Sequence, residues 1–183
     1  GQVLTDSGEI NPIPATNPVD HLTISVDGTL DEAAATASTV SLGDTGPADI
    51  PDWGGESDLS GDLAFTWDDD NLYVSAVITD DAQVQPASGG SIWQGDSLQI
   101  AVADGAPGDA AAWNELGFAL TASGPEAWQW QSVGGAAGPA SDVQVEVVRD
   151  ETAKTTTYEA AIPWASVAPS TPDERLLSIS AVV

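Results

Sequence analysis

Residues 63 to 81, Leu-Ala-Phe-Thr-Trp-Asp-Asp-Asp-Asn-Leu-Tyr-Val-Ser-Ala-Val-Ile-Thr-Asp-Asp, decide the fold class of this chain. Apolar side chains alternate with others on both sides of an acidic segment, as they do in strands that bury one face. Asp and Asn side chains bond to nearby backbone and tolerate tight turns. The stretch therefore predicts a β-hairpin over Asp62–Thr79.

Short alternating segments of this kind recur along the chain between turn signals. They predict strands at Leu22–Val26, Asp62–Trp67, Asn71–Thr79, Ser97–Ala103, Leu116–Thr121, Glu126–Gln131, Val143–Arg149, Thr155–Ile162 and Leu176–Val183. Strands in this number favour an all-β fold, an antiparallel β-sandwich of two packed sheets with jelly-roll or immunoglobulin-like topology. The one helix-like passage, Leu30–Ala37, predicts one or two turns.

Alternation also assigns the faces of the strands, because successive side chains point to opposite sides. The residues expected in the core are Leu63, Phe65, Trp67, Leu72, Val74, Ala76, Ile78, Leu98, Ile100, Val102, Val143, Val145, Val147, Tyr158, Ala160, Ile162, Leu177, Ile179 and Ala181.

A chain of 183 residues suits one domain. Residues 1–21, with Pro12, Pro14 and Pro18, show no periodicity and predict an extended leader or linker. Residues 22–183 form the expected sandwich. Its last strand is apolar and has no following segment to pair with it, so we expect either truncation at the C-terminus or association through that strand, with another copy or with other domains of a parent protein.

The charge balance limits the partners. There are 29 Asp and Glu residues against three Lys and Arg, for a formal charge of -26. Such a field repels nucleic acid and anionic membranes but leaves neutral sugars unaffected. The chain has no cysteine, which excludes disulfides and thiol catalysis.

Several kinds of catalytic and metal chemistry lack the residues they need. His21 is the one histidine and reads as a solvated imidazole at the domain boundary, so a Ser-His-Asp triad is not expected. Only oxygen ligands remain for a metal, which makes calcium in the acidic loops Asp27–Asp31, Asp68–Asp70 or Asp80–Asp81 the candidate cofactor, with turn formation as the favoured role of these loops. A carboxylate pair for glycoside hydrolysis is compatible with the composition, but no pair stands out.

Trp93 is the most suggestive of the seven tryptophans. Gly89 and Gly90 precede it and Gly95 follows it, which leaves little local bulk to bury an indole. An exposed flat ring can stack on the apolar face of a sugar. The alternative is an indole that folds back as a lid on the end of the sandwich.

Four segments together resemble family 9 carbohydrate-binding modules. They are SVDGTLDE from Ser25, the stretch quoted above, IWQGDSLQIAV from Ile92 and TTTYEAAIPWASV from Thr155. The resemblance covers about residues 25–183 and implies a β-sandwich appended to a secreted glycan-degrading enzyme. It implies that Trp93 is one of two aromatic walls around a sugar. With it we take Gln94, Asp96, Gln99 and the loop tryptophan Trp113 as the candidate binding residues.

The chain departs from the family pattern in three places. Gln99 stands where the family commonly has Glu, and it is uncharged but still donates and accepts hydrogen bonds. A basic residue that helps to hold the sugar has no counterpart, since no Lys or Arg precedes Arg149. The segment that carries the second aromatic wall would follow Val183. Another tryptophan substitutes for that wall, or the chain is truncated, or sugar binding has been lost.

These observations predict a non-catalytic module of a secreted, extracellular protein that binds a neutral oligosaccharide or polysaccharide. The rival prediction is a structural or protein-interaction domain that keeps the sandwich without sugar binding. Haem binding is disfavoured because the chain has no Met and only one His as axial ligands.

Overall fold

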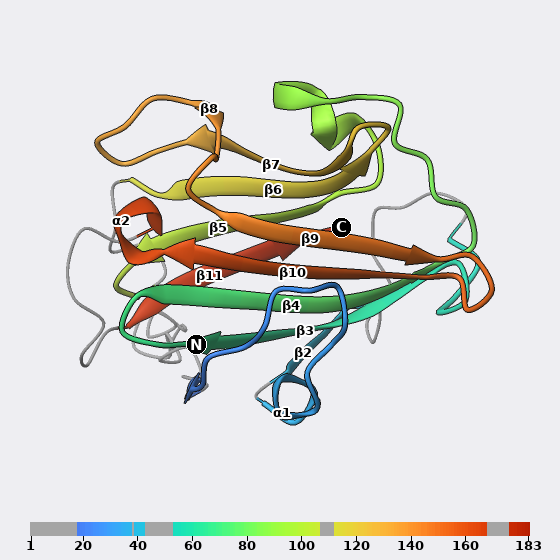
Figure 1. Cartoon of the computed structure of the whole chain (residues 1–183), viewed down its shortest axis with the longest axis horizontal. Coiled ribbons are helices and arrows are strands. Elements are labelled where there is room, and N and C mark those ends of the chain that lie inside the picture. The colour runs from blue at the N-terminus through green and yellow to red at the C-terminus, as the bar shows by residue number, and fades with distance from the viewer. Residues whose placement is uncertain (1–17, 38, 43–52, 107–111, 168–175) are drawn as a thin grey trace, which may run out of the picture.

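The computed structural model describes residues 18–183, apart from 38, 43–52, 107–111 and 168–175, and it is a sandwich of two β-sheets (Figure 1). The six-stranded sheet contains β1 (Asp20–His21), β2 (Thr39–Leu42), β3 (Leu59–Trp67), β4 (Asn71–Asp80), β9 (Gln144–Asp150) and β10 (Thr155–Pro163). Its order is β1-β3-β4-β10-β9, and β2 also pairs with β3.

The five-stranded sheet contains β5 (Leu98–Asp104), β6 (Asn114–Thr121), β7 (Gly124–Gln131), β8 (Gly138–Pro139) and β11 (Leu177–Val182), in the order β11-β5-β6-β7-β8. All strand pairs are antiparallel except β1 with β3. The predicted antiparallel β-sandwich is confirmed. Short helices are α1 (Glu32–Ala35), η2 (Gly89–Gln94) and α2 (Trp164–Val167), and no helix in the described ranges is long and apolar enough to cross a membrane.

The predicted hairpin is present as β3 and β4. Asp68 closes its turn, because one carboxylate oxygen accepts the backbone N–H groups of Asp70 and Asn71 at 2.9 and 2.8 Å. The other accepts the hydroxyl of Tyr73 at 2.6 Å. Burial works against ionisation of Asp68, but these donors outweigh it and lower its pKa.

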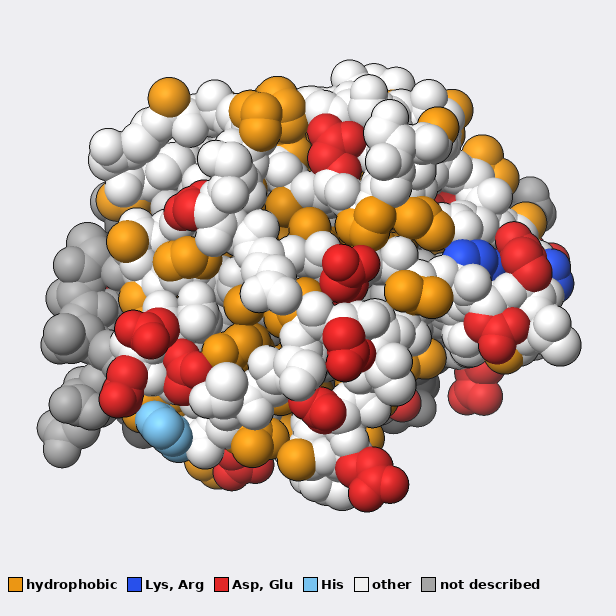
Figure 2. Space-filling model, viewed as in Figure 1, with side chains coloured by type: hydrophobic (Ala, Val, Ile, Leu, Met, Phe, Trp, Pro, Cys, Tyr) orange, Lys and Arg blue, Asp and Glu red, His pale blue; other side chains and the backbone are white. Residues whose placement is uncertain are grey.

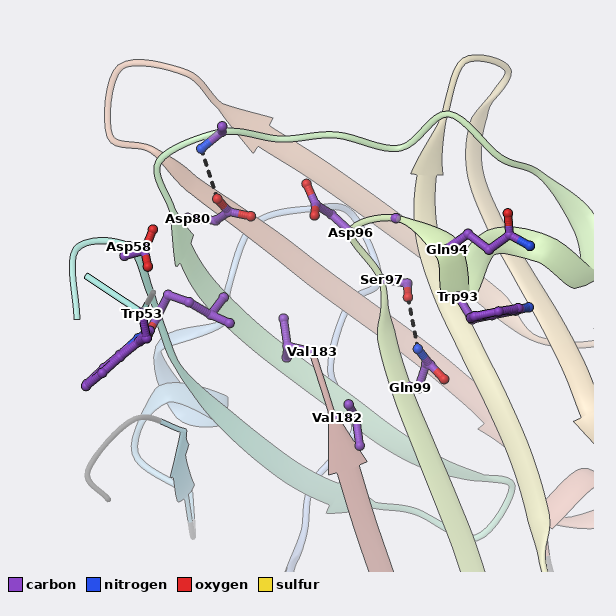
Figure 3. Close-up of a pocket in the computed structure, with 13 residues that line it drawn as sticks. Trp53, Asp58, Asp80, Trp93, Gln94, Asp96, Ser97, Gln99, Val182 and Val183 are labelled. Carbon is purple, nitrogen blue, oxygen red and sulfur yellow. Dashed lines mark hydrogen bonds between the residues drawn. The ribbon is translucent and has the colours of Figure 1, made fainter. Parts of the chain in front are cut away.

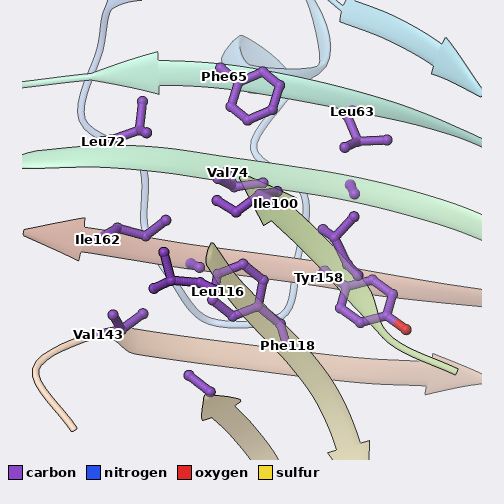
Figure 4. Packing of buried hydrophobic residues seen from close by; sticks show 14 of the residues in the cluster. Leu63, Phe65, Leu72, Val74, Ile100, Leu116, Phe118, Val143, Tyr158 and Ile162 are labelled. Atoms are coloured by element: carbon purple, nitrogen blue, oxygen red, sulfur yellow. The ribbon is translucent and has the colours of Figure 1, made fainter. Parts of the chain in front are cut away.

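The core lies between the two sheets (Figure 4). Nearly all of the predicted inward residues are in it, with Val145, Leu177, Ile179 and Ala181 only partly buried at its margin. Trp67 is half-buried and lies outside this cluster, where its indole donates to the carbonyl of Val19 at 3.0 Å. Its ring makes a T-shaped contact with the His21 imidazole, with the two ring centroids 4.4 Å apart.

The prediction of a strand at Leu22–Val26 is wrong. This segment has no regular ladder and crosses the outer face of the six-stranded sheet. Its apolar residues pack in a second cluster against Tyr73 and Ala161. The alternation that suggested a strand therefore reflects side chains that cover a sheet. Among the described residues, the backbone of the segment makes only single bonds to that sheet, from the Leu22 N–H to the Trp67 carbonyl and from the Gln144 amide to the Val26 carbonyl.

A buried carboxylate holds this N-terminal segment. Glu159 of β10 is fully buried, and one of its oxygens accepts the backbone N–H groups of Asp27 and Gly28 at 3.0 and 2.8 Å. Its other oxygen has no hydrogen-bond partner among the described residues. Burial raises the pKa of Glu159, the two N–H donors lower it, and the charges of Asp27 and Asp31 raise it further, with a net upward shift.

This shift predicts a measurable pH dependence for Glu159→Gln. A raised folded-state pKa contributes stability that is fully present below the ordinary glutamate pKa of about 4.3 and is lost as pH rises through the raised value. The Gln variant does not titrate, so its stability relative to wild type should increase as pH rises above the ordinary glutamate pKa, as measured in urea unfolding experiments. Glu32→Gln is the control, because Glu32 is exposed. A difference in unfolding free energy between Glu159→Gln and wild type that does not change with pH would contradict the raised pKa.

Acidic side chains are scattered over the visible surface, whereas the blue of Lys and Arg is confined to one end (Figure 2). The formal charge of -26 makes the folded state repel itself, and salt screens that repulsion.

We therefore expect added sodium chloride to raise the melting temperature in calorimetry, where about 1 kcal/mol corresponds to about 2–4 °C for a domain of this size. Calcium at matched ionic strength tests the acidic loops, because a specific site stabilises by mass action beyond screening. Equal effects of calcium and magnesium would argue against such a site. A melting temperature that is insensitive to sodium chloride would show that self-repulsion is negligible.

Candidate functional site

The turn that carries Trp93 is the short 3₁₀ helix η2, which precedes β5. Ile92 is completely buried, whereas the next side chain, Trp93, is 57% exposed. The lid alternative is therefore not what the structure shows: the neighbour of Trp93 enters the core and Trp93 points out.

Two further tryptophans support this turn. The ring of Trp128 lies beside the backbone of Gly89 and Gly90, so close that a Cβ on Gly90 would be 3.3 Å from it. The indole of Trp130 donates to the carbonyl of Gly90 at 2.8 Å. Both indoles are half-buried on the outer face of the five-stranded sheet, and they serve as a scaffold beneath the turn.

Trp130 fits there because Gly117 of β6 has no side chain. A Cβ at Gly117 would be 2.4 Å from a ring carbon of Trp130. The strand register skips Trp130 between the pairs Glu115–Gln131 and Leu116–Gln129, which is a β-bulge. Bulges re-aim side chains, and this one turns the indole over β6 toward η2.

The C-terminal end of the turn is fixed by Gln85 and Asp96. The Gln85 amide donates to the carbonyls of Ile92 and Asp96 at 2.8 and 3.0 Å. Asp96 makes two hydrogen bonds with the backbone of Val84. Its N–H donates to the Val84 carbonyl at 3.0 Å, and its carboxylate accepts the Val84 N–H. Gly95 is required in between, since a Cβ there would be 2.6 Å from the Val84 carbonyl oxygen.

An open hollow of about 500 Å³ lies beside the turn (Figure 3). Its lining residues are Trp53, Asp58, Leu59, Asp80, Ala82, Trp93, Gln94, Gly95, Asp96, Ser97, Gln99, Val182 and Val183. In Figure 3, Trp53 and Trp93 lie on opposite sides of the end of β11, so the two indoles do not face each other as a close pair of walls. Gln99 lies on β5 beside Trp93, and its amide is bonded to the Ser97 hydroxyl at 3.3 Å.

The charged residues of this lining, Asp58, Asp80 and Asp96, are all acidic. Asp96 is partly buried, which raises its pKa; the Val84 N–H lowers it, and the neighbouring charge of Asp80 raises it again. Polar groups, acidic charge and an exposed indole suit a ligand that carries many hydroxyls and no negative charge.

Four of the five predicted site residues, Trp93, Gln94, Asp96 and Gln99, line the hollow. Trp113 does not: it is 46% exposed and directly precedes β6, at the other end of the five-stranded sheet. Sequence reasoning missed Trp53, which joins the lining from the loop before β3 and whose indole donates to the Leu59 carbonyl at 3.1 Å. No local pattern marks Trp53, because only the fold brings that loop beside β5 and β11.

Arg149 and the acidic loops have structural partners. Arg149 does not line the hollow; its guanidinium is nearly buried and donates to the Asp80 carbonyl at 2.8 Å. In the acidic loops, Asp27 and Asp80 accept backbone N–H groups two residues further on, which is turn chemistry. Within the described ranges, no three His, Asp or Glu side chains are grouped as metal ligands.

A β-sandwich that displays an indole on a braced turn, beside an open polar hollow, has the architecture of a sugar-binding module. The family comparison agrees: residues 26–180 match the model of the carbohydrate family 9 binding domain-like family, and the chain belongs to that family.

Solved structures show the same fold. The chain is similar to a family 9 carbohydrate-binding module from Caldicellulosiruptor kristjanssonii in complex with glucose, with 14% identity and a TM-score of 0.60 over 88% of this chain and 73% of that one. It is similarly related to a family 9 module from that organism in complex with cellotriose, with 15% identity, a TM-score of 0.60, and 88% and 72% coverage. A search of curated proteins finds no match.

The contact between Gly117 and Trp130 predicts the effect of Gly117→Ala. The new methyl group would push the indole away, and such overpacking costs about 1–3 kcal/mol of stability. We expect a lower melting temperature together with a red shift in tryptophan fluorescence. Gly138→Ala is the matched control, because a Cβ there meets nothing within 4 Å. Equal melting temperatures for the two variants would refute the role given to the contact.

Proposed function

We propose that this chain is a non-catalytic carbohydrate-binding module that stacks a ring of a neutral glycan on Trp93 and bonds its hydroxyls with Gln94, Asp96 and Gln99. The observation that carries the proposal is the exposure of the Trp93 indole on a turn whose backbone is held by hydrogen bonds from Trp130 and Gln85. An indole held in this way loses little further conformational freedom on binding, so more of the contact energy remains as affinity.

The polar groups next to the indole support recognition of hydroxyls. Gln99 offers both a donor and an acceptor, and the carboxylate of Asp96 accepts. The uncharged Gln99 in place of a family Glu lowers the negative charge of the hollow without removing its hydrogen-bonding groups. The remaining acidic lining disfavours uronic acids and sulfated sugars.

Family membership supports the wider setting of the proposal. The similar structures from Caldicellulosiruptor contain glucose and cellotriose, which makes neutral β-glucans the first ligands to test. We propose that the module belongs to a secreted, glycan-active protein whose catalytic machinery lies outside this chain.

The proposal predicts that Trp93→Ala weakens glycan binding by about 1–3 kcal/mol, the scale of a lost aromatic anchor, and leaves the melting temperature nearly unchanged. Isothermal titration with glucose, cellotriose and the corresponding xylan and mannan sugars measures the first quantity, and calorimetry the second. Val84→Ala is the control, because Val84 is an exposed apolar residue on the same end of the sandwich.

Two results would overturn the proposal. One is wild-type protein that binds none of these sugars. The other is a Trp93→Ala variant that melts far below wild type with unchanged affinity, which would make Trp93 a structural residue.

One observation favours the rival function, a protein-interaction domain. Among the strands that the structure describes, β11 pairs with β5 alone, and residues Leu177–Val182 include no charged side chain to deter another strand. Leu176 and Val182 are exposed there, at 44% and 56%. A dimer in light scattering together with an absence of glycan binding would support the interaction domain; a monomer that binds sugar would exclude it as the main function.

A further inference from the structure

The hollow beside η2, called the Trp93 hollow below, lies at one end of the outer face of the five-stranded sheet. This face continues from the hollow toward the opposite end of the sandwich. Register places Val182, Gln99 and Gly117 side by side in one row across β11, β5 and β6. The next row consists of Ser180, Ala101 and Glu115. The third begins with Ser178 and Ala103.

The middle of this face carries mostly short side chains and few charges. The inward side chains of β5, Leu98, Ile100 and Val102, are buried, so Gln99, Ala101 and Ala103 form the outer row along the strand. Ser180 and Ser178 of β11 and Gly117 and Glu115 of β6 lie beside them, and the exposed Val182 is next to Gln99. Of the strand positions just named, Glu115 is the one with a charge. The indole of Trp130 borders the first row, because it lies over Gly117.

Trp113 lies at the far end of the same face. The residue after it, Asn114, pairs with Val102 and points inward, where its amide donates to the Val167 carbonyl at 2.8 Å. Because side chains alternate, Trp113 emerges on the outer side together with Glu115. In line with this, its side chain is exposed whereas Asn114 is 5% exposed.

The two exposed tryptophans are therefore at opposite ends of one face. Figure 1 shows η2 near one end of the five-stranded sheet, while β6 begins at the other. Gln99 lies next to Trp93, and Ala103 lies next to the position of Trp113. Four residue steps along β5 lead from one to the other, which is about 13 Å at about 3.3 Å per residue. A single sugar ring cannot touch both indoles, but a chain of several rings can.

We propose that Trp113 is a second stacking platform, and that a linear neutral glycan lies along β5 from the Trp93 hollow to Trp113, over the floor formed by Gln99, Ala101, Ala103 and Ser180. This inference rests on the proposed function and adds to it the length and course of the ligand. The side chains of the floor are short enough for a chain to pass above them, and the amide of Gln99 and the hydroxyl of Ser180 can bond to sugar hydroxyls on the way. Glu115, as an acceptor at the margin, fits a neutral glycan and disfavours an acidic one.

The experiment measures affinity as a function of chain length. Titration calorimetry is carried out with glucose, xylose and mannose, and with their β-1,4-linked trimers and hexamers, on wild type, Trp93→Ala and Trp113→Ala. Val133→Ala is the matched control, since Val133 is an exposed apolar residue that is bonded through its N–H to Asn114 at the same end as Trp113.

We expect wild type to bind the hexamer of its preferred sugar more tightly than the monomer. Trp113→Ala should weaken hexamer binding about tenfold, as expected for one lost aromatic anchor, and leave monomer binding unchanged. Trp93→Ala should weaken both. A second variant, Ala101→Arg, places a long side chain across the floor and should reduce hexamer affinity to that of the monomer while the melting temperature stays within a few degrees of wild type.

The outcomes separate the two proposals. Equal affinity of wild type for monomer and hexamer, or an unchanged hexamer affinity in both Trp113→Ala and Ala101→Arg, overturns the second platform but leaves the Trp93 site standing. Absence of binding to every sugar in wild type overturns both.

Discussion

The indole of Trp130 rests on the bare backbone of Gly117 and donates its N–H to the carbonyl of Gly90. This contact joins β6, β7 and the turn that precedes β5 in one unit. Because the turn cannot move toward or away from the sheet without breaking it, Ile92 stays in the core and Trp93 stays in solvent. The candidate site is therefore a rigid feature of the sandwich, although it is built on a loop rich in glycine.

The same arrangement explains why a protein with few aromatic residues devotes so many of them to one region. Trp128 and Trp130 are used as support, and their rings lie against the bare backbone of Gly89, Gly90 and Gly117. Trp93 can then be presented to solvent without a cost in core packing. The role of each tryptophan follows from its neighbours. Trp130 packs on the bare backbone of Gly117, and Trp93 is turned outward because the preceding Ile92 is in the core. Trp113 is turned outward because the following Asn114 points inward.

Most of the fold could be predicted from the sequence, because period-two alternation reports directly on which side of a strand meets the core. The hairpin at Asp68 could also be predicted, since its turn is built from local hydrogen bonds. Alternation failed at Leu22–Val26, where apolar residues cover a sheet without joining it. For the candidate site, Trp93, Gln94, Asp96 and Gln99 are close in sequence, so a local pattern was enough to predict that they lie beside one hollow. Trp53 was missed, because it reaches the hollow only through the pairing of strands that are distant in the chain.

The attachment of the N-terminal segment by Glu159 has a consequence for how this family member can vary. The carboxylate binds backbone N–H groups and no side chain of the loop, so the loop is recognised by its path and not by its residues. Gly28 is constrained by its backbone, since it has φ +83° and a Cβ there would lie 2.4 Å from Val148. The exposed positions of this loop, such as Ser25 and Thr29, can change while the anchor is retained, whereas Ile24 and its apolar neighbours hold the loop on the sheet. This makes it a tolerant surface on which new contacts could evolve, on the sheet opposite to the one that carries Trp93.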